Sequence, residues 1–215
     1  MKKHYEIPRN FDIEILFRNH LSVTHIEQLS LIVKLTAKYM VIDRTVLNYR
    51  ADKEFGLGII SKAVKLGLIS EYPQAETNIY IYNLGATGLL LAHKANYLIG
   101  KLPIDASLEL RKNILHLNHF LIKNQLDISE SFAPNPKDGF VVCNETVSKN
   151  LVICYFDDIA FTDIKKKVLT GLSKTRFRNE AKNIKFILVA GGDSRIDTDT
   201  EGTIYEKLSQ IHFDV

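Results

Sequence analysis

The sequence lacks several features that would place it in a specialised class of protein. Its only cysteines are Cys143 and Cys154, too few for a disulfide scaffold or a four-thiolate zinc site, so we expect two buried, reduced thiols. No apolar run reaches the roughly 18 residues that a membrane span requires. The stretch MKKHYEIPRN also lacks the apolar centre of a signal peptide, which predicts a cytoplasmic protein with no membrane partner.

Local motifs for the common enzyme chemistries are also absent. No serine–histidine–aspartate or cysteine–histidine arrangement is recognisable by local spacing. The stretch 190–195 (AGGDSR) follows an expected strand, but it has neither the third glycine nor the Lys-Ser/Thr pair of a phosphate-binding loop. We interpret it as a tight turn that exposes Asp193 and Arg195, and we expect no cofactor.

Composition and charge are those of an ordinary folded protein. The chain has 215 residues, of which 46% are hydrophobic and 25% charged, enough for one large or two small domains. The net charge of +3 is unevenly distributed: residues 20–125 carry twelve basic and eight acidic side chains, whereas residues 126–215 carry twelve and fourteen. This cationic middle segment suits a polyanionic partner but is too mild to identify one.

The N-terminal part contains three helical patterns, in which apolar residues recur at helical spacing. The segments that we expect to be helical are 24–39, 43–50 and 54–66. Thr24 and Asp43 are the expected N-caps of the first two. Gly67 suits the left-handed position that follows the third.

Two strands are expected directly after these helices. Residues 68–72 and 78–84 are rich in β-branched and aromatic side chains, and the polar segment 73–77 separates them, which predicts a hairpin. Three helices followed by a hairpin is the order of a winged helix-turn-helix, in which the third helix can enter a major groove while the hairpin touches the DNA backbone. We therefore predict a winged-helix DNA-binding domain over residues 1–100.

Two further helices are expected before a domain boundary. The first covers 87–98 with Thr87 as its N-cap, and the second covers 106–125 with Asp105 as its N-cap. The broad apolar face of the second helix suits packing within the monomer or pairing with a second subunit. The proline-containing stretch 127–139 marks the boundary.

Beyond this boundary the sequence alternates between strand and helix patterns. The expected strands are 139–144, 151–156 and 184–189, and the expected helices are 162–172 and 203–210. We predict an α+β protein with a helical connector over 101–133 and a small α/β domain over 134–215. The first two strands would place Cys143 and Cys154 on neighbouring strands, which does not by itself establish a disulfide.

The strongest candidate for chemistry is the basic helix 54–66. The residues that we expect to contact DNA are Arg50, Lys53, Ser61, Lys62 and Lys65. Lys62 and Lys65 share one face of the helix and can reach phosphates, with Ser61 nearby. The alternative is a solvated helix face. The hairpin is acidic to neutral, with Glu71 and Glu76, so it is a poor phosphate clamp and weakens the DNA interpretation.

Two other constellations are weaker candidates. His116 and His119 can meet on one helix face and bind a metal, but no third ligand is evident, so packing is the preferred interpretation. The acids Asp138, Asp157 and Asp158 lie at expected strand ends, as in a nuclease that binds a divalent metal. Tyr155 occupies the position where the intervening glutamate would sit, and we therefore expect no catalysis.

Several stretches carry a resemblance to a known family. They are the string SKAVKLGLISEYPQAETNIYIYNLGATGLLLAHK, the helix NILHLNHFLI, the segment PNPKDGFVVC, and the run LVICYFDDIAFTDIKKKVLTGL to IKFILVAG. Together they resemble the replication-relaxation family of plasmid and mobile-element proteins. The resemblance implies an N-terminal winged helix and a C-terminal lobe similar to a restriction-endonuclease core. It places the family's acids at Asp138 and Asp157, and Tyr155 departs from the family's glutamate.

These observations predict a cytoplasmic DNA-binding protein of a bacterial plasmid or other mobile element. It would act on double-stranded DNA as a transcriptional regulator or as an accessory factor in replication or transfer. The degenerate, non-catalytic C-terminal lobe would mediate homodimer formation or contact another protein of the same element. The alternatives are a metal-dependent nuclease that uses Asp138 and Asp157, and a protein-interaction module whose winged helix no longer binds DNA.

Overall fold

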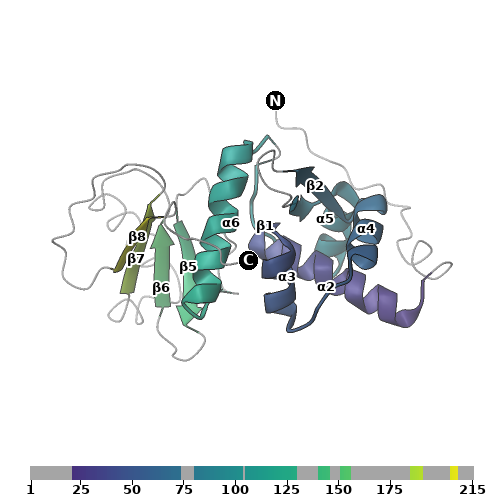
Figure 1. Cartoon of the computed structure of the whole chain (residues 1–215), viewed down its shortest axis with the longest axis horizontal. Helices are drawn as coiled ribbons and strands as arrows, with labels where there is room; N and C mark the ends of the chain where they lie inside the picture. The colour runs from purple at the N-terminus through teal and green to yellow at the C-terminus, as the bar shows by residue number, and fades with distance from the viewer. Residues whose placement is uncertain are drawn as a thin grey trace. The chain divides into compact units, whose positions relative to one another are not determined.

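The computed structural model describes residues 21–73, 80–103, 105–129, 140–145, 151–155, 185–190 and 204–207. The fold is α+β, and the chain divides into two compact units, Met1–Ile99 and Gly100–Val215. Each unit has its own sheet and at least one helix (Figure 1). Among the described residues, no helix has both the length and the hydropathy needed to cross a membrane.

The described part of the first unit combines four helices with a small antiparallel sheet. Its described elements are α2 (Val23–Tyr39), β1 (Val41–Ile42), α3 (Arg44–Ala51), α4 (Leu57–Lys65), β2 (Ile69–Pro73), β3 (Tyr80–Leu84) and α5 (Ala86–Lys94). The strand order is β1-β3-β2, with Ile42 and Glu71 on either side of Tyr82. The three expected helices and the hairpin are present, whereas the two-residue strand β1 was not expected.

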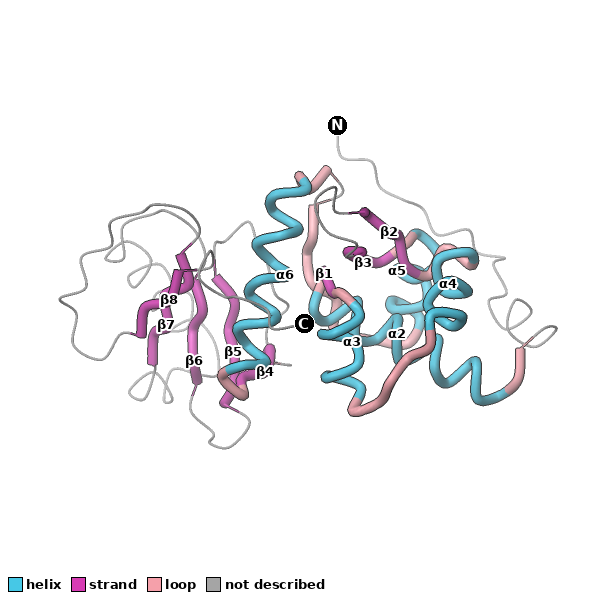
Figure 2. Tube along the Cα trace, viewed as in Figure 1, coloured by secondary structure: helices cyan, strands magenta, loops and turns pink. Residues whose placement is uncertain are grey.

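Helix α2 forms the centre of this unit and packs against α3, α4, α5 and β3. Three of its apolar residues at helical spacing, Leu29, Ile32 and Val33, are completely buried. Figure 2 shows the helices of this unit gathered on its small sheet. The core therefore follows from the helical periodicity of the sequence.

Side-chain caps begin helices α2 and α3, and one of the two caps differs from expectation. Asp43 caps α3 as expected, because its Oδ1 accepts a hydrogen bond from the Val46 amide at 2.7 Å. The predicted cap Thr24 is wrong. Ser22 caps α2 instead and accepts from the His25 amide at 3.3 Å, so the helix begins one residue earlier than its expected start.

Helix α4 ends at a glycine in the left-handed conformation, as expected. Gly67 has φ +66° and donates its amide to the Val64 carbonyl at 2.9 Å. The Leu68 amide donates to the Ala63 carbonyl at 2.9 Å, which completes a Schellman motif. This turn directs the chain from α4 into β2.

The same turn also begins helix α5. The Gly67 carbonyl accepts hydrogen bonds from the amides of Thr87 and Gly88, at 3.1 and 3.3 Å. A Cβ at Gly88 would overlap the Leu68 carbonyl, and one at Gly85 would overlap the Gly67 carbonyl. The expected cap Thr87 is therefore wrong: the N-cap is Gly85, and a backbone carbonyl replaces the side-chain cap.

The described residues of the second unit form one long helix and a five-stranded mixed sheet. Its described elements are α6 (Leu108–Lys123), β4 (Leu126–Ile128), β5 (Phe140–Glu145), β6 (Leu151–Tyr155), β7 (Lys185–Ala190) and β8 (Ile204–Lys207). The strand order is β4-β5-β6-β7-β8, antiparallel from β4 to β6 and parallel from β6 to β8. Helix α6 packs against β4 (Figure 2).

Three expectations for the second unit are corrected. Ser107, and not Asp105, caps α6, because its hydroxyl accepts from the Leu110 amide at 3.1 Å. Strand β4 lies at the start of the expected boundary segment and pairs with β5. Strand β8 lies where a helix was expected over 203–210. Pairing with β7 gives the backbone of this Ile-Tyr-Glu-Lys stretch its hydrogen-bond partners, and its residue types are compatible with a strand. The helix expected at 162–172 lies outside the described residues.

The cysteines lie on paired strands but do not face each other in register. Cys143 on β5 is opposite Val152, and Cys154 on β6 is opposite Val141. Cys143 is buried, and its thiol donates a weak hydrogen bond to the Val141 carbonyl at 3.9 Å.

Candidate nucleic-acid interface

The turn between α3 and α4 is held rigidly by its own side chains. Phe55 is completely buried, and its amide donates to the Asn48 Oδ1 at 3.0 Å. Asp52 ends α3 in the left-handed conformation, with φ +48°. This turn therefore defines where α4 starts relative to α3.

Helix α4 separates a buried face from an exposed one. Ile59, Ile60 and Ala63 are buried in the core of the first unit. The opposite face carries Leu57, Gly58, Ser61, Lys62 and Lys65, at the spacing that one side of a helix requires. All of these are exposed except Lys62, which is half-buried. The expected stripe of Ser61, Lys62 and Lys65 is thus accessible.

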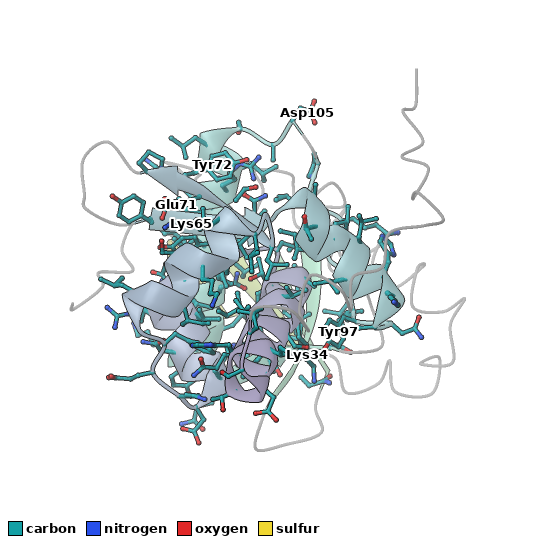
Figure 3. All side chains as sticks on the ribbon, turned by 90° about the vertical axis from the view of Figure 1, so that its right-hand side faces the viewer. Lys34, Lys65, Glu71, Tyr72, Tyr97 and Asp105 are labelled. Carbon is teal, nitrogen blue, oxygen red and sulfur yellow. The ribbon has the colours of Figure 1, made fainter. Side chains whose placement is uncertain are left out.

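The two lysines of α4 extend from its last turn. The structure gives neither ammonium an ion pair with any of the residues that it describes. Strand β2 packs beside α4, and Figure 3 shows Lys65 with Glu71 and Tyr72 of β2 on the same side of the unit. Lys53, in the turn before α4, is also exposed. These three cations can reach an external anion.

Arg50 occupies a different environment from the lysines. Its guanidinium carbon lies 4.8 Å from the centroid of the Tyr39 ring and 5.8 Å from that of Tyr49. The side chain is half-buried, and Tyr39 is completely enclosed in the core. Arg50 therefore stacks on the aromatic rings of its own unit through cation–π interactions. Its expected contact with a DNA backbone stays a prediction.

The hairpin presents an acidic group beside the helix. Glu71 is exposed and accepts a hydrogen bond from the Tyr82 hydroxyl. Burial, followed by the charge of Glu71, raises the pKa of Tyr82 to about 12. Glu76 lies outside the described residues. The described part of the hairpin contains no lysine or arginine, so it cannot clamp phosphates.

The histidine pair lies on α6. His116 and His119 are both half-buried. Burial, and then the charges of His119 and Lys112, lower the pKa of His116. Within the described ranges, no three histidine, cysteine, aspartate or glutamate side chains come together in a geometry that could hold a metal. The interpretation of this pair as packing residues stays a prediction.

The acidic candidates Asp138, Asp157 and Asp158 lie outside the described residues, as do Asp193 and Arg195. The nearest described positions are Phe140 and Tyr155, which are paired across β5 and β6. The nuclease interpretation therefore stays a sequence prediction.

Comparison with known proteins identifies no relative: no family model, curated protein or solved structure matches the chain. The resemblance to the replication-relaxation family stays a prediction from the motifs. The interface must be interpreted from its own residues. The sequence pattern predicts that Leu57 packs with Ile60 and Ala63, and this is wrong, because Leu57 is exposed. It also misses Gly58, although the spacing of four residues from Ser61 and Lys62 places Leu57 and Gly58 on the same face.

Proposed function

We propose that this chain binds double-stranded DNA through helix α4, as a regulator or an accessory factor in replication or transfer of a mobile element. Two cations on the outer face of α4, the exposed Lys65 and the half-buried Lys62, are the observation that carries the proposal. Cations on such a face neutralise phosphates and release counterions, which provides most of the free energy of non-specific DNA binding.

The order of elements in the first unit supports this proposal. A winged helix-turn-helix has helices followed by a hairpin, and its third helix is the one that enters the major groove. Helix α4 is the third described helix of this unit, and β2 and β3 follow it. The neighbouring strand β1 completes a three-stranded sheet. Under this proposal the second unit mediates self-association, so that two copies of α4 contact paired half-sites.

The acidic character of the hairpin supports one alternative, a protein-interaction module that has lost DNA binding. Glu71 is exposed beside Lys65 in the view of Figure 3 and would repel a phosphate that approached the hairpin. Under this alternative, α4 would contact an acidic protein surface.

A mobility-shift assay distinguishes the two functions. The probe is the DNA that flanks the gene of this chain, together with a random-sequence duplex pool, at two salt concentrations. We expect retardation that weakens as salt increases. Absence of retardation at low salt, together with specific capture of one protein partner, would contradict the DNA-binding proposal.

A further inference from the structure

The first turn of α4 exposes an apolar side chain that the fold does not use. Leu57 is 67% exposed, the largest fraction among the large hydrophobic side chains of the described residues. Ile59 and Ile60, in the same turn, are buried. Among the described residues, the buried face of α4 attaches the helix to the core without Leu57, which leaves this side chain available to a partner.

The neighbouring glycine is equally unexplained by the fold. A Cβ built on Gly58 would meet no heavy atom within 4 Å, and the φ of Gly58 is not positive. Gly88 shows the opposite case, because a Cβ there would overlap the Leu68 carbonyl. Neither packing nor backbone conformation requires glycine at position 58, although glycine lowers the stability of a helix.

The exposed face of α4 has two ends of different chemistry. The N-terminal end carries Leu57 and Gly58, and the C-terminal end carries Lys62 and Lys65. In helix-turn-helix proteins the N-terminal residues of the recognition helix contact base edges. The cations at the other end suit phosphates, so the charge of the face is complementary to DNA.

We infer that Leu57 recognises the 5-methyl group of thymine in the major groove, and that Gly58 lets the helix approach the bases closely. The inference rests on the proposed DNA-binding function. A leucine side chain can neither donate nor accept a hydrogen bond. The thymine methyl is the apolar group that the bases present in the major groove, and contact with an apolar side chain is the established way to recognise it.

The test uses duplexes that the wild-type protein selects from a random-sequence pool. Each thymine is replaced singly by deoxyuridine, which removes only the methyl group, and Kd is measured by fluorescence anisotropy. We expect one or two positions at which the replacement weakens wild-type binding about fourfold. The variant Leu57→Ala should bind thymine and deoxyuridine duplexes equally at those positions. Leu89→Ala, which truncates an exposed leucine on α5, should keep the wild-type difference.

A second variant tests the close approach of the helix. Gly58→Ala adds a methyl group in open space, so it should raise Tm by about 1–4 °C. The same methyl group should weaken DNA binding about fivefold or more, because it would collide with the bases that the helix approaches. If Gly58 had a purely structural role, Tm and the affinity for DNA would change in the same direction.

Four results would overturn the inference. Unchanged wild-type affinity at every deoxyuridine position, or an equal loss on both duplexes for Leu57→Ala, would refute thymine recognition while DNA binding stands. A shift of Leu57→Ala to a smaller species in analytical ultracentrifugation would assign Leu57 to contact with a second copy. Failure of the wild-type protein to bind any duplex would refute the proposed function as well.

Discussion

Removing both lysines of α4 is the most direct test of the interface. Lys62 and Lys65 make no ion pair with the described residues, so Lys62→Ala with Lys65→Ala should leave the fold intact. Both cations lie in the last turn of α4, where each interacts favourably with the helix dipole and stabilises the helix by about 0.3–1 kcal/mol. The higher helix propensity of alanine offsets part of this loss. We expect the free energy of unfolding to fall by less than about 2 kcal/mol.

The effect on DNA binding follows from counterion release. Each phosphate contact contributes about −0.9 to the slope of log K against log salt, so two lost contacts reduce the steepness of the slope by about 1.8. Over a roughly fourfold increase in salt, the wild-type protein should therefore lose about 12-fold more affinity than the double variant. The variant should also bind more weakly at low salt.

Fluorescence anisotropy titrations of one duplex at several salt concentrations measure this slope, and circular dichroism melting verifies the fold. The matched control is Lys34→Ala with Lys94→Ala, which removes two exposed lysines from α2 and α5. The control should keep the wild-type slope. An unchanged slope in the α4 variant, or the same change in both double variants, would refute the reasoning.

Three further predictions concern stability and ionisation. Gly88→Ala should lower the free energy of unfolding by about 3 kcal/mol, because its Cβ would overlap a backbone carbonyl, and Gly58→Ala is the control without such overlap. Asp43→Ala removes the cap of α3 and should cost about 1–2 kcal/mol in denaturant unfolding, whereas Asp43→Asn should retain most of the stability. Glu71→Gln should lower the pKa of Tyr82 from about 12, measured by ultraviolet titration against Tyr82→Phe. Because the pKa of Tyr82 is raised from 10.0, its stabilising effect is complete below pH 10.0 and is lost as pH rises through about 12, and unchanged alkaline unfolding in Tyr82→Phe would contradict this.

The helical part of the first unit was predictable because its signals are local. Asp43 and Gly67 act as expected, since a cap and a left-handed turn depend on a few neighbouring residues. The strand β1 was not predictable in the same way. It has only two residues, and its conformation depends on pairing with β3, which lies far along the chain.

In the candidate interface too, local features were predictable from the sequence, whereas features that depend on tertiary packing were not. The accessible face that contains Lys62 and Lys65 follows from helical periodicity, and the structure agrees with it. The position of Arg50 could not be read from the sequence, because its stacking on Tyr39 depends on how α3 packs beside α2. The exposure of Leu57 was missed for a related reason, since an apolar residue in a helix is ordinarily expected to be buried.

The sequence by itself determined the helices of the first unit, its hairpin and the polar face of α4, because these depend on periodicity and short-range hydrogen bonds. Only the tertiary structure decided that 204–207 is a strand and that a backbone carbonyl begins α5. It also decided which cations remain available to a partner. Strand pairing and aromatic stacking join residues that are distant in the chain, so no local pattern encodes them.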